Sequence, residues 1–181
     1  MGKIWFCADN HFGQERTLEK SKRPFDSVQE MDFVMLSNWN RVVKPGDTVY
    51  MLGDVGIMKI LPLLNGDKIL IKGNYERRVE SLLKGFEHNF KEIYEEKHTI
   101  TVNKDEKEYV INLVHEPKRV RDIPIDETHI NLYGHVHKLC MIKSYGICVS
   151  VDAHHFTPID LDTVLFYQHA LLNYYDEDVF Y

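Results

Sequence analysis

The sequence predicts an α/β fold in which layers of strands are covered by helices. Short runs rich in β-branched and aromatic residues recur along the whole chain, and helical patterns alternate with them in its first half. The runs expected to form strands are residues 4–8, 48–52, 68–71, 109–114, 130–133 and 147–151. Because the 181 residues contain no repeat and no low-complexity linker, we expect a single domain over residues 1–181.

Three segments outside these runs have the pattern of helices. The strongest begins at Ser27, which has the position of the N-cap in a capping box, and apolar residues then keep near-helical spacing until Pro45. A shorter helix is expected over residues 76–84. A third is expected over residues 161–172, with Asp160 as its N-cap.

The middle of the chain has the pattern of a β-hairpin. Segments 93–103 and 107–114 are strand-like and flank the charged triplet Lys104-Asp105-Glu106, which is typical of an exposed turn. The second half is therefore rich in strands, and the helices are expected to lie outside the layers that these strands form.

Composition excludes several classes of protein. The 28 acidic and 22 basic residues give a formal net charge of -6, which argues against a protein that coats nucleic acid but allows a small phosphorylated substrate. Three cysteines without a CxxC pair, and an N-terminus without a signal-peptide pattern, predict a cytoplasmic protein. No apolar run approaches the roughly 20 residues of a membrane helix, so no membrane association is expected.

Polar residues, most of them of metal-binding types, begin within three residues of the end of five expected strands. They are Asp9, Asn10 and His11, then Asp54, then Asn74, then His115, and finally His135 and His137. Loops at the carboxyl ends of strands converge on ligands in open α/β sheets. The alternating pairs Asp9/His11 and His135/His137 would project to one side of an extended segment, so that each pair could hold one ion.

Not every motif in this set is specific. Asp-x-His and Gly-Asp are frequent by chance, and Asp152-Ala153-His154 is a second Asp-x-His that we interpret as such a chance match. The motif Gly134-His135-x-His137 is expected far less than once in a chain of this composition. Single members could be turn, capping or structural residues, but the ordered set favours a metal centre.

The residue types indicate the metal and the chemistry. Imidazole, carboxylate and amide ligands without thiolate suit manganese, iron, cobalt, nickel or zinc. Two such ions about 3.5–4 Å apart can share a carboxylate and stabilise in-line attack on phosphorus. We expect manganese, and we expect activity to fall below roughly pH 6.5 because the ligand imidazoles must be neutral.

The segments Asp9-x-His11, Gly53-Asp54, Gly73-Asn74-x-Glu76, His115 and Gly134-His135-x-His137 resemble the calcineurin-like metallophosphoesterases. The resemblance spans about residues 3–152 and is strongest to compact bacterial and phage-borne members. It implies a two-sheet β-sandwich flanked by helices in four α/β/β/α layers, and a binuclear centre at which a water or hydroxide bridging two metal ions attacks the substrate. The ligands implied for the first ion are Asp9, His11, Asp54 and His137. Those implied for the second are Asn74, His115, His135 and the bridging Asp54.

The sequence departs from that family at Tyr75, where a histidine is common. A tyrosine can donate a hydrogen bond but cannot supply the positive charge of an imidazolium, which favours phosphodiesters over phosphomonoesters. Packing beside the site is the alternative role for Tyr75. Glu76 is expected to orient a ligand or the acid, so that the catalytic set comprises Asp54, Asn74, Tyr75 and Glu76.

Substrate contacts are expected from Asn10 and Arg77, with solvated surface charge as the alternative for the arginine. Gln14 is expected to affect substrate contacts rather than metal ions. Three functions stay open at this point. They are a metal-dependent phosphodiesterase acting on a small nucleotide or similar substrate, a nuclease or phosphomonoesterase that processes nucleic-acid ends, and an inactive interaction scaffold.

Overall fold

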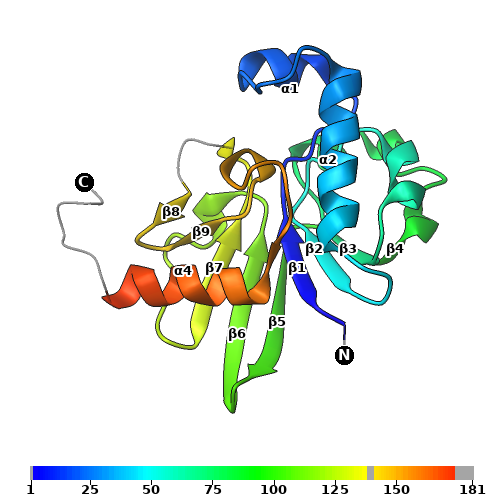
Figure 1. Ribbon diagram of the computed structural model, residues 1–181. Helices are drawn as coiled ribbons and strands as arrows, with labels where there is room; N and C mark the ends of the chain where they lie inside the picture. The colour runs from blue at the N-terminus through cyan, green and yellow to red at the C-terminus, as the bar shows by residue number, and fades with distance from the viewer. Residues whose placement is uncertain (1, 138–140, 174–181) are drawn as a thin grey trace.

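A computed structural model describes residues 2–137 and 141–173, and within them ten strands form two five-stranded sheets (Figure 1). The first sheet has the order β10-β1-β2-β3-β4 and contains β1 (Ile4–Cys7), β2 (Thr48–Met51), β3 (Asp67–Ile71), β4 (Phe90–Tyr94) and β10 (Ile159–Asp160). The second has the order β5-β6-β7-β9-β8 and contains β5 (Lys97–Lys104), β6 (Lys107–Val114), β7 (His129–Tyr133), β8 (Ile142–Lys143) and β9 (Gly146–Cys148). Both sheets are mixed, with parallel strands at their centres.

The helices are α1 (Glu15–Lys20), α2 (Val28–Val42), α3 (Asn74–Arg78) and α4 (Leu161–Asn173), with short 3-10 turns between them. Two sequence-based predictions of helix starts are confirmed. The Ser27 side chain accepts a hydrogen bond from the N–H of Glu30, and Asp160 Oδ1 accepts one from the N–H of Thr163. In the described part of the chain, no helix has the length and apolar character needed to cross a membrane.

The core lies on both sides of the first sheet, because successive side chains of a strand point to opposite faces. Trp5 and Cys7 of β1 pack with Trp39 and other apolar residues of α2. Phe6 and Ala8 belong to the cluster that fills the space between the two sheets. The expected α/β fold with two sheets flanked by helices is thus present.

A helix was expected as the fourth layer, outside the second sheet, and the structure differs there. Helix α4 contacts β1, β9 and β10 and adds Val164 to the core between the sheets, so it closes one edge of the sandwich. The outer face of the second sheet is covered by the loop after β6, where the Asn131 side chain donates to the carbonyls of Val120 and Ile123. This loop contains the 3-10 turn η4 (Pro117–Arg119).

Two predicted elements also change. The helix expected over residues 76–84 ends at Arg78, because Val79 leaves the helical region with φ -128° and ψ 76°, and η2 (Glu80–Leu82) follows. Segment 93–103, expected as the first strand of the hairpin, is divided between the two sheets. Its beginning lies in β4, which pairs with β3, and its remainder lies in β5, which pairs with β6. The turn at Asp105 and Glu106 is confirmed, and both residues have positive φ.

Candidate metal centre

The carboxyl ends of β1, β2, β3, β6 and β7 meet at one edge of the molecule. Parallel pairing aligns these ends within each sheet, and the bridge between Ala8 and Ser150 joins the two sheets there. A pocket of 390 Å³ opens at this edge. Six of the predicted site residues line it, namely His11, Asp54, Asn74, Tyr75, His135 and His137. Asp9 and His115 are fully buried.

Two groups of side chains have the geometry to hold a metal ion. One comprises Asp9, His11 and His137, and the other comprises Asp9, Asp54 and His115. In each group one potential ligand atom per residue lies within 4.8 Å of the others. The structure therefore brings together five of the seven predicted ligands. Asp9 belongs to both groups, whereas the resemblance implies Asp54 as the shared ligand.

Asp54 belongs to the second group and also approaches a histidine of the first. Its Oδ2 is 3.7 Å from His11 Nε2 and 3.6 Å from His115 Nε2, and these histidines belong to different groups. The other oxygen, Oδ1, accepts a hydrogen bond from the N–H of Tyr75 at 2.9 Å. One carboxylate oxygen is thus fixed by the backbone, and the other lies between two imidazoles.

The three histidines of these groups are oriented in the same way. Nδ1 of His11 lies 2.8 Å from Gln14 Oε1, Nδ1 of His115 lies 2.7 Å from the Leu52 carbonyl, and Nδ1 of His137 lies 2.8 Å from Asp152 Oδ2. A hydrogen bond from Nδ1–H to oxygen leaves Nε2 with its lone pair, as in most metal-binding histidines.

Several buried atoms at the centre have no hydrogen-bond partner among the described residues. They are Asp9 Oδ1, His11 Nε2 and His115 Nε2. Most buried polar atoms in proteins are paired, and an unpaired one costs about 1–3 kcal/mol. Three such atoms that converge on two candidate ion positions are the donor set that a divalent cation would satisfy.

The backbone at the centre is strained in a way that only tertiary structure enforces. Left-handed φ values between 51° and 73° occur at Asp9, His11, Asp54, His135 and His137. Non-glycine residues rarely adopt this conformation, and it is concentrated at functional sites. Five of the seven predicted ligands share it.

Close backbone approach explains the glycines beside the ligands. A Cβ on Gly73 would lie 2.3 Å from Asp54 Oδ1, and one on Gly134 would lie 2.9 Å from Asp9 Oδ2. Neither position leaves space for a side chain. The Gly73-Asn74 and Gly134-His135 motifs therefore seat the two carboxylates against the backbone.

Sequence reasoning missed two residues that hold the centre together. Arg23 is buried and donates to the carbonyls of Asp9 and Asn10, at 2.6 and 2.8 Å, and to Asp152 Oδ2 at 2.7 Å. Asp152 also binds His137. The interpretation of Asp152-x-His154 as a chance match agrees with this, because Asp152 pairs with His137 whereas His154 Nε2 lies 2.7 Å from the Cys148 carbonyl.

Asn74 and His135 are placed beside the two groups. The Asn74 side-chain nitrogen lies 2.9 Å from His135 Nδ1, and its Oδ1 accepts a hydrogen bond from Arg77. Arg77 is also paired with Glu116 at 2.5 Å. Arg77 thus positions Asn74 in this structure, and its contact with substrate stays a prediction.

The other predicted residues occupy distinct positions. Glu76 is fully buried and accepts hydrogen bonds from the N–H groups of Gly73, Asp54 and Val55, so it fixes backbone. The Tyr75 ring packs edge-on against His11 with 5.1 Å between ring centres.

Asn10 and Gln14 make their contacts inside the fold. Asn10 is buried, and its Oδ1 lies 3.7 Å from Cys7 Sγ, so its contact with phosphate stays a prediction. Gln14 binds His11, and its expected effect on substrate contacts stays a prediction.

Comparison with known proteins places the chain among uncharacterised relatives. No protein-family model matches it. The uncharacterized protein MJ1445 of Methanocaldococcus jannaschii is 30% identical over 178 residues, which cover 91% of this chain and 90% of that protein. The chain belongs to the MJ1445 family.

Two further proteins are similar to this chain. The gene 66 protein of Mycobacterium phage L5 is 34% identical over 85 residues, which cover 42% of this chain and 41% of that protein. The crystal structure of AQ665, a protein of unknown function from Aquifex aeolicus, superposes with a TM-score of 0.65 at 26% identity. That match covers 91% of this chain and 98% of AQ665, so the two share a fold over nearly their whole lengths.

The histidines of this MJ1445-family member differ in their affinity for protons. Burial lowers the pKa of His11 and of His135 below the ordinary value. Burial also acts on His137, but the hydrogen bond to Asp152 and the charge of Asp9 outweigh it and raise the pKa. Burial would raise the pKa of Asp152, but hydrogen bonds from His137 and Arg23 hold it at about 2. Neutral imidazole binds metal, so protons compete with a metal ion at His137 up to a higher pH than at His11 or His135.

Proposed function

We propose that this protein is a metal-dependent phosphodiesterase of the calcineurin-like type, with two divalent ions, most readily manganese, as its cofactors. Iron, zinc, nickel and cobalt suit the same ligands. The observation that carries the proposal is the position of Asp54 Oδ2 between the unpartnered Nε2 atoms of His11 and His115. A cytoplasmic location and a small phosphorylated substrate belong to the same proposal.

The residues fit this cofactor. Asp9, His11 and His137 would hold one ion, and His115, Asn74 and His135 the other, with Asp54 shared. Each carboxylate keeps one oxygen available, because Asp9 Oδ2 accepts from the N–H of His135 at 2.8 Å and Asp54 Oδ1 is bound to Tyr75. Imidazole, carboxylate and amide donors together match borderline divalent ions.

The reaction proposed is hydrolysis of a phosphodiester. When bound, two divalent ions lower the pKa of water and offset charge on phosphoryl oxygens. Water adds to phosphorus, the bond to the leaving oxygen breaks, and one proton of the water ends on that oxygen. Tyr75 lines the pocket beside His11 and would donate a hydrogen bond to the leaving group, while Glu76 fixes the Asp54 backbone.

Metal content and turnover test the proposal together. Purified protein loaded with Mn²⁺ should bind two ions per chain and hydrolyse bis-p-nitrophenyl phosphate faster than p-nitrophenyl phosphate. Asp54→Asn should lose that turnover, whereas Asp122→Asn, on the exposed surface, should keep it. Bound metal with faster monoester hydrolysis would favour a phosphomonoesterase. No bound metal and no turnover would favour an interaction scaffold.

A further inference from the structure

The pocket at the candidate metal centre has a second chemical feature, which is a cluster of cations. Arg16 and Lys20 of α1 and Arg78 at the end of α3 line the same 390 Å³ pocket as the predicted ligands. All three are exposed. In the described part of the chain, none of them forms an ion pair within 4.0 Å, whereas Arg23 and Arg77 are both paired.

Helix α1 separates its charges between two faces. Arg16 and Lys20 are four residues apart and line the pocket at the metal centre, together with Thr17. Glu15 and Glu19 have the same spacing and line a different pocket. The two faces are therefore oppositely charged, and the positive one lies toward the candidate ligands.

The charges of α1 form no favourable pair four residues apart. Like charges four residues apart repel each other, whereas a mixed pattern would have allowed favourable pairs on each face. The cations of α1 and Arg78 come from segments that are far apart in the sequence and meet only at this pocket. In a chain of net charge -6, such a group of unpaired cations is suited to an anion brought by the substrate.

We propose that the substrate carries a second phosphate group, bound by Arg16, Lys20 and Arg78, in addition to the phosphodiester that reacts. This inference rests on the proposed function, because the reacting group is taken to lie at the candidate metal ligands. Guanidinium groups bind phosphate through paired hydrogen bonds, and a lysine adds a point charge. Tyr75 and Val79, which also line the pocket, offer apolar surface for a sugar or base between the two phosphates.

Matched dinucleotides test the proposal with the Mn²⁺-loaded full chain. The probes are ApA, which has only the internal diester, pApA, with an added 5′-phosphate, and ApAp, with an added 3′-phosphate. At least one phosphorylated probe should exceed ApA in kcat/KM by about tenfold, the effect of one charge-assisted contact. That gain should disappear in Arg16→Gln/Lys20→Gln and in Arg78→Gln, but persist in Lys84→Gln, an exposed lysine outside the pocket.

A binding measurement gives a second readout that needs no turnover. In EDTA, adenosine 3′,5′-bisphosphate should bind the native protein more tightly than AMP, and Arg16→Gln/Lys20→Gln should abolish the difference. Equal kcat/KM for ApA, pApA and ApAp, with equal binding of the two nucleotides, would overturn the inference. Hydrolysis of ApA in the same experiment would still support the proposed function. Tight bisphosphate binding without hydrolysis of any diester would support the phosphate site and contradict the proposed phosphodiesterase activity.

Discussion

The carboxylate of Glu76 holds the backbone of Asp54 from inside the protein. Its Oε2 accepts hydrogen bonds from the N–H of Asp54 and of Gly73, each at 2.9 Å, and its Oε1 accepts from the N–H of Val55 at 2.9 Å. Asp54 has φ 55°, so a buried carboxylate compensates for a conformation that the residue would not adopt alone. Glu76 is thus a positioning residue for the carboxylate that lies between His11 and His115.

Glu76→Gln should therefore weaken metal binding without removing a ligand. The amide nitrogen of glutamine cannot accept a hydrogen bond, so at least one backbone N–H would stay unpaired. We expect a loss of about 1–3 kcal/mol in the free energy of unfolding. Manganese affinity should fall about 10–100-fold, as for other residues that orient metal ligands. Calorimetric titration with Mn²⁺ and urea unfolding measure both.

The matched control is Glu87→Gln, an exposed glutamate outside the centre. It should change neither quantity. Native manganese affinity in a destabilised Glu76→Gln variant would show that Glu76 serves folding alone.

Gln14 should contribute to metal affinity through His11. Its Oε1 accepts from His11 Nδ1 at 2.8 Å, and its side chain makes no capping bond to helix α1. Gln14→Ala should lower manganese affinity about 10–100-fold, whereas Gln14→Glu should preserve it because a carboxylate accepts the same proton. Gln29→Ala, at an exposed position, is the control. Equal affinities for native protein and Gln14→Ala would exclude this role.

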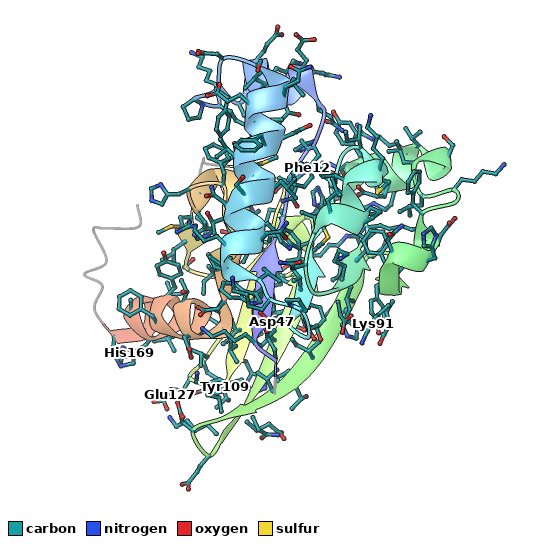
Figure 2. The ribbon with its side chains drawn as sticks, turned by 45° about the vertical axis from the view of Figure 1, so that its right-hand side comes forward. Phe12, Asp47, Lys91, Tyr109, Glu127 and His169 are labelled. Carbon is teal, nitrogen blue, oxygen red and sulfur yellow. The ribbon has the colours of Figure 1, made fainter. Side chains whose placement is uncertain are left out.

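Acid should destabilise the protein partly through Asp47. This residue lies at the opposite end of the first sheet from Phe12, which follows His11 in the chain (Figure 2). Burial would raise the pKa of Asp47, but hydrogen bonds from the N–H groups of Lys44 and Lys3 and from the Trp5 indole outweigh it and lower the pKa. A lowered pKa means that the stabilisation is complete above the unfolded value of about 3.9 and is lost as pH falls through the folded value.

Asp47→Asn should consequently cost about 1–3 kcal/mol at pH 7, and the difference from native protein should shrink below about pH 4. Urea unfolding between pH 3 and pH 7 measures it. Asp122→Asn should follow the native curve. A difference that stays constant over this range would mean that Asp47 acts through packing and not through its charge.

The sequence predicted the strand ends well because each apolar run is followed by a polar residue, either directly or after one glycine. Asp9, Asp54 and His115 could therefore be assigned to one edge before any contact was known. Helix α1 was not predicted, since its six residues bury only Thr17 and have no apolar periodicity. The helix over residues 76–84 was overpredicted because Val79 departs from helical geometry, which its side chain does not reveal.

The contacts that orient the ligands could not be predicted for a different reason. Arg23 and Asp152 are 129 residues apart, and their pairing depends on how the two sheets are joined. The left-handed backbone of His135 likewise follows from tertiary hydrogen bonds, such as the one from its N–H to Asp9. Residue type and spacing identify ligands, but long-range contacts decide which atom of each ligand is available.

Tyr75 should determine the preference between diesters and monoesters. It lines the pocket, and its ring packs against His11, so a side chain at this position can reach a substrate held at Asp54. A neutral phenol donates a hydrogen bond but adds no positive charge, whereas a protonated histidine would offset the additional negative charge of a monoester. Tyr75→His should therefore lower the ratio of kcat/KM for bis-p-nitrophenyl phosphate to that for p-nitrophenyl phosphate, by about tenfold.

The control for this experiment is Tyr75→Phe, which keeps the ring and removes only the hydroxyl. If the hydroxyl assists the leaving group, Tyr75→Phe should slow the diester without accelerating the monoester, and metal content should match that of native protein. Because Tyr75 also gives its N–H to Asp54, a backbone contact that neither variant removes, the position of Asp54 should be preserved. An unchanged ratio in Tyr75→His would assign Tyr75 to packing beside the site.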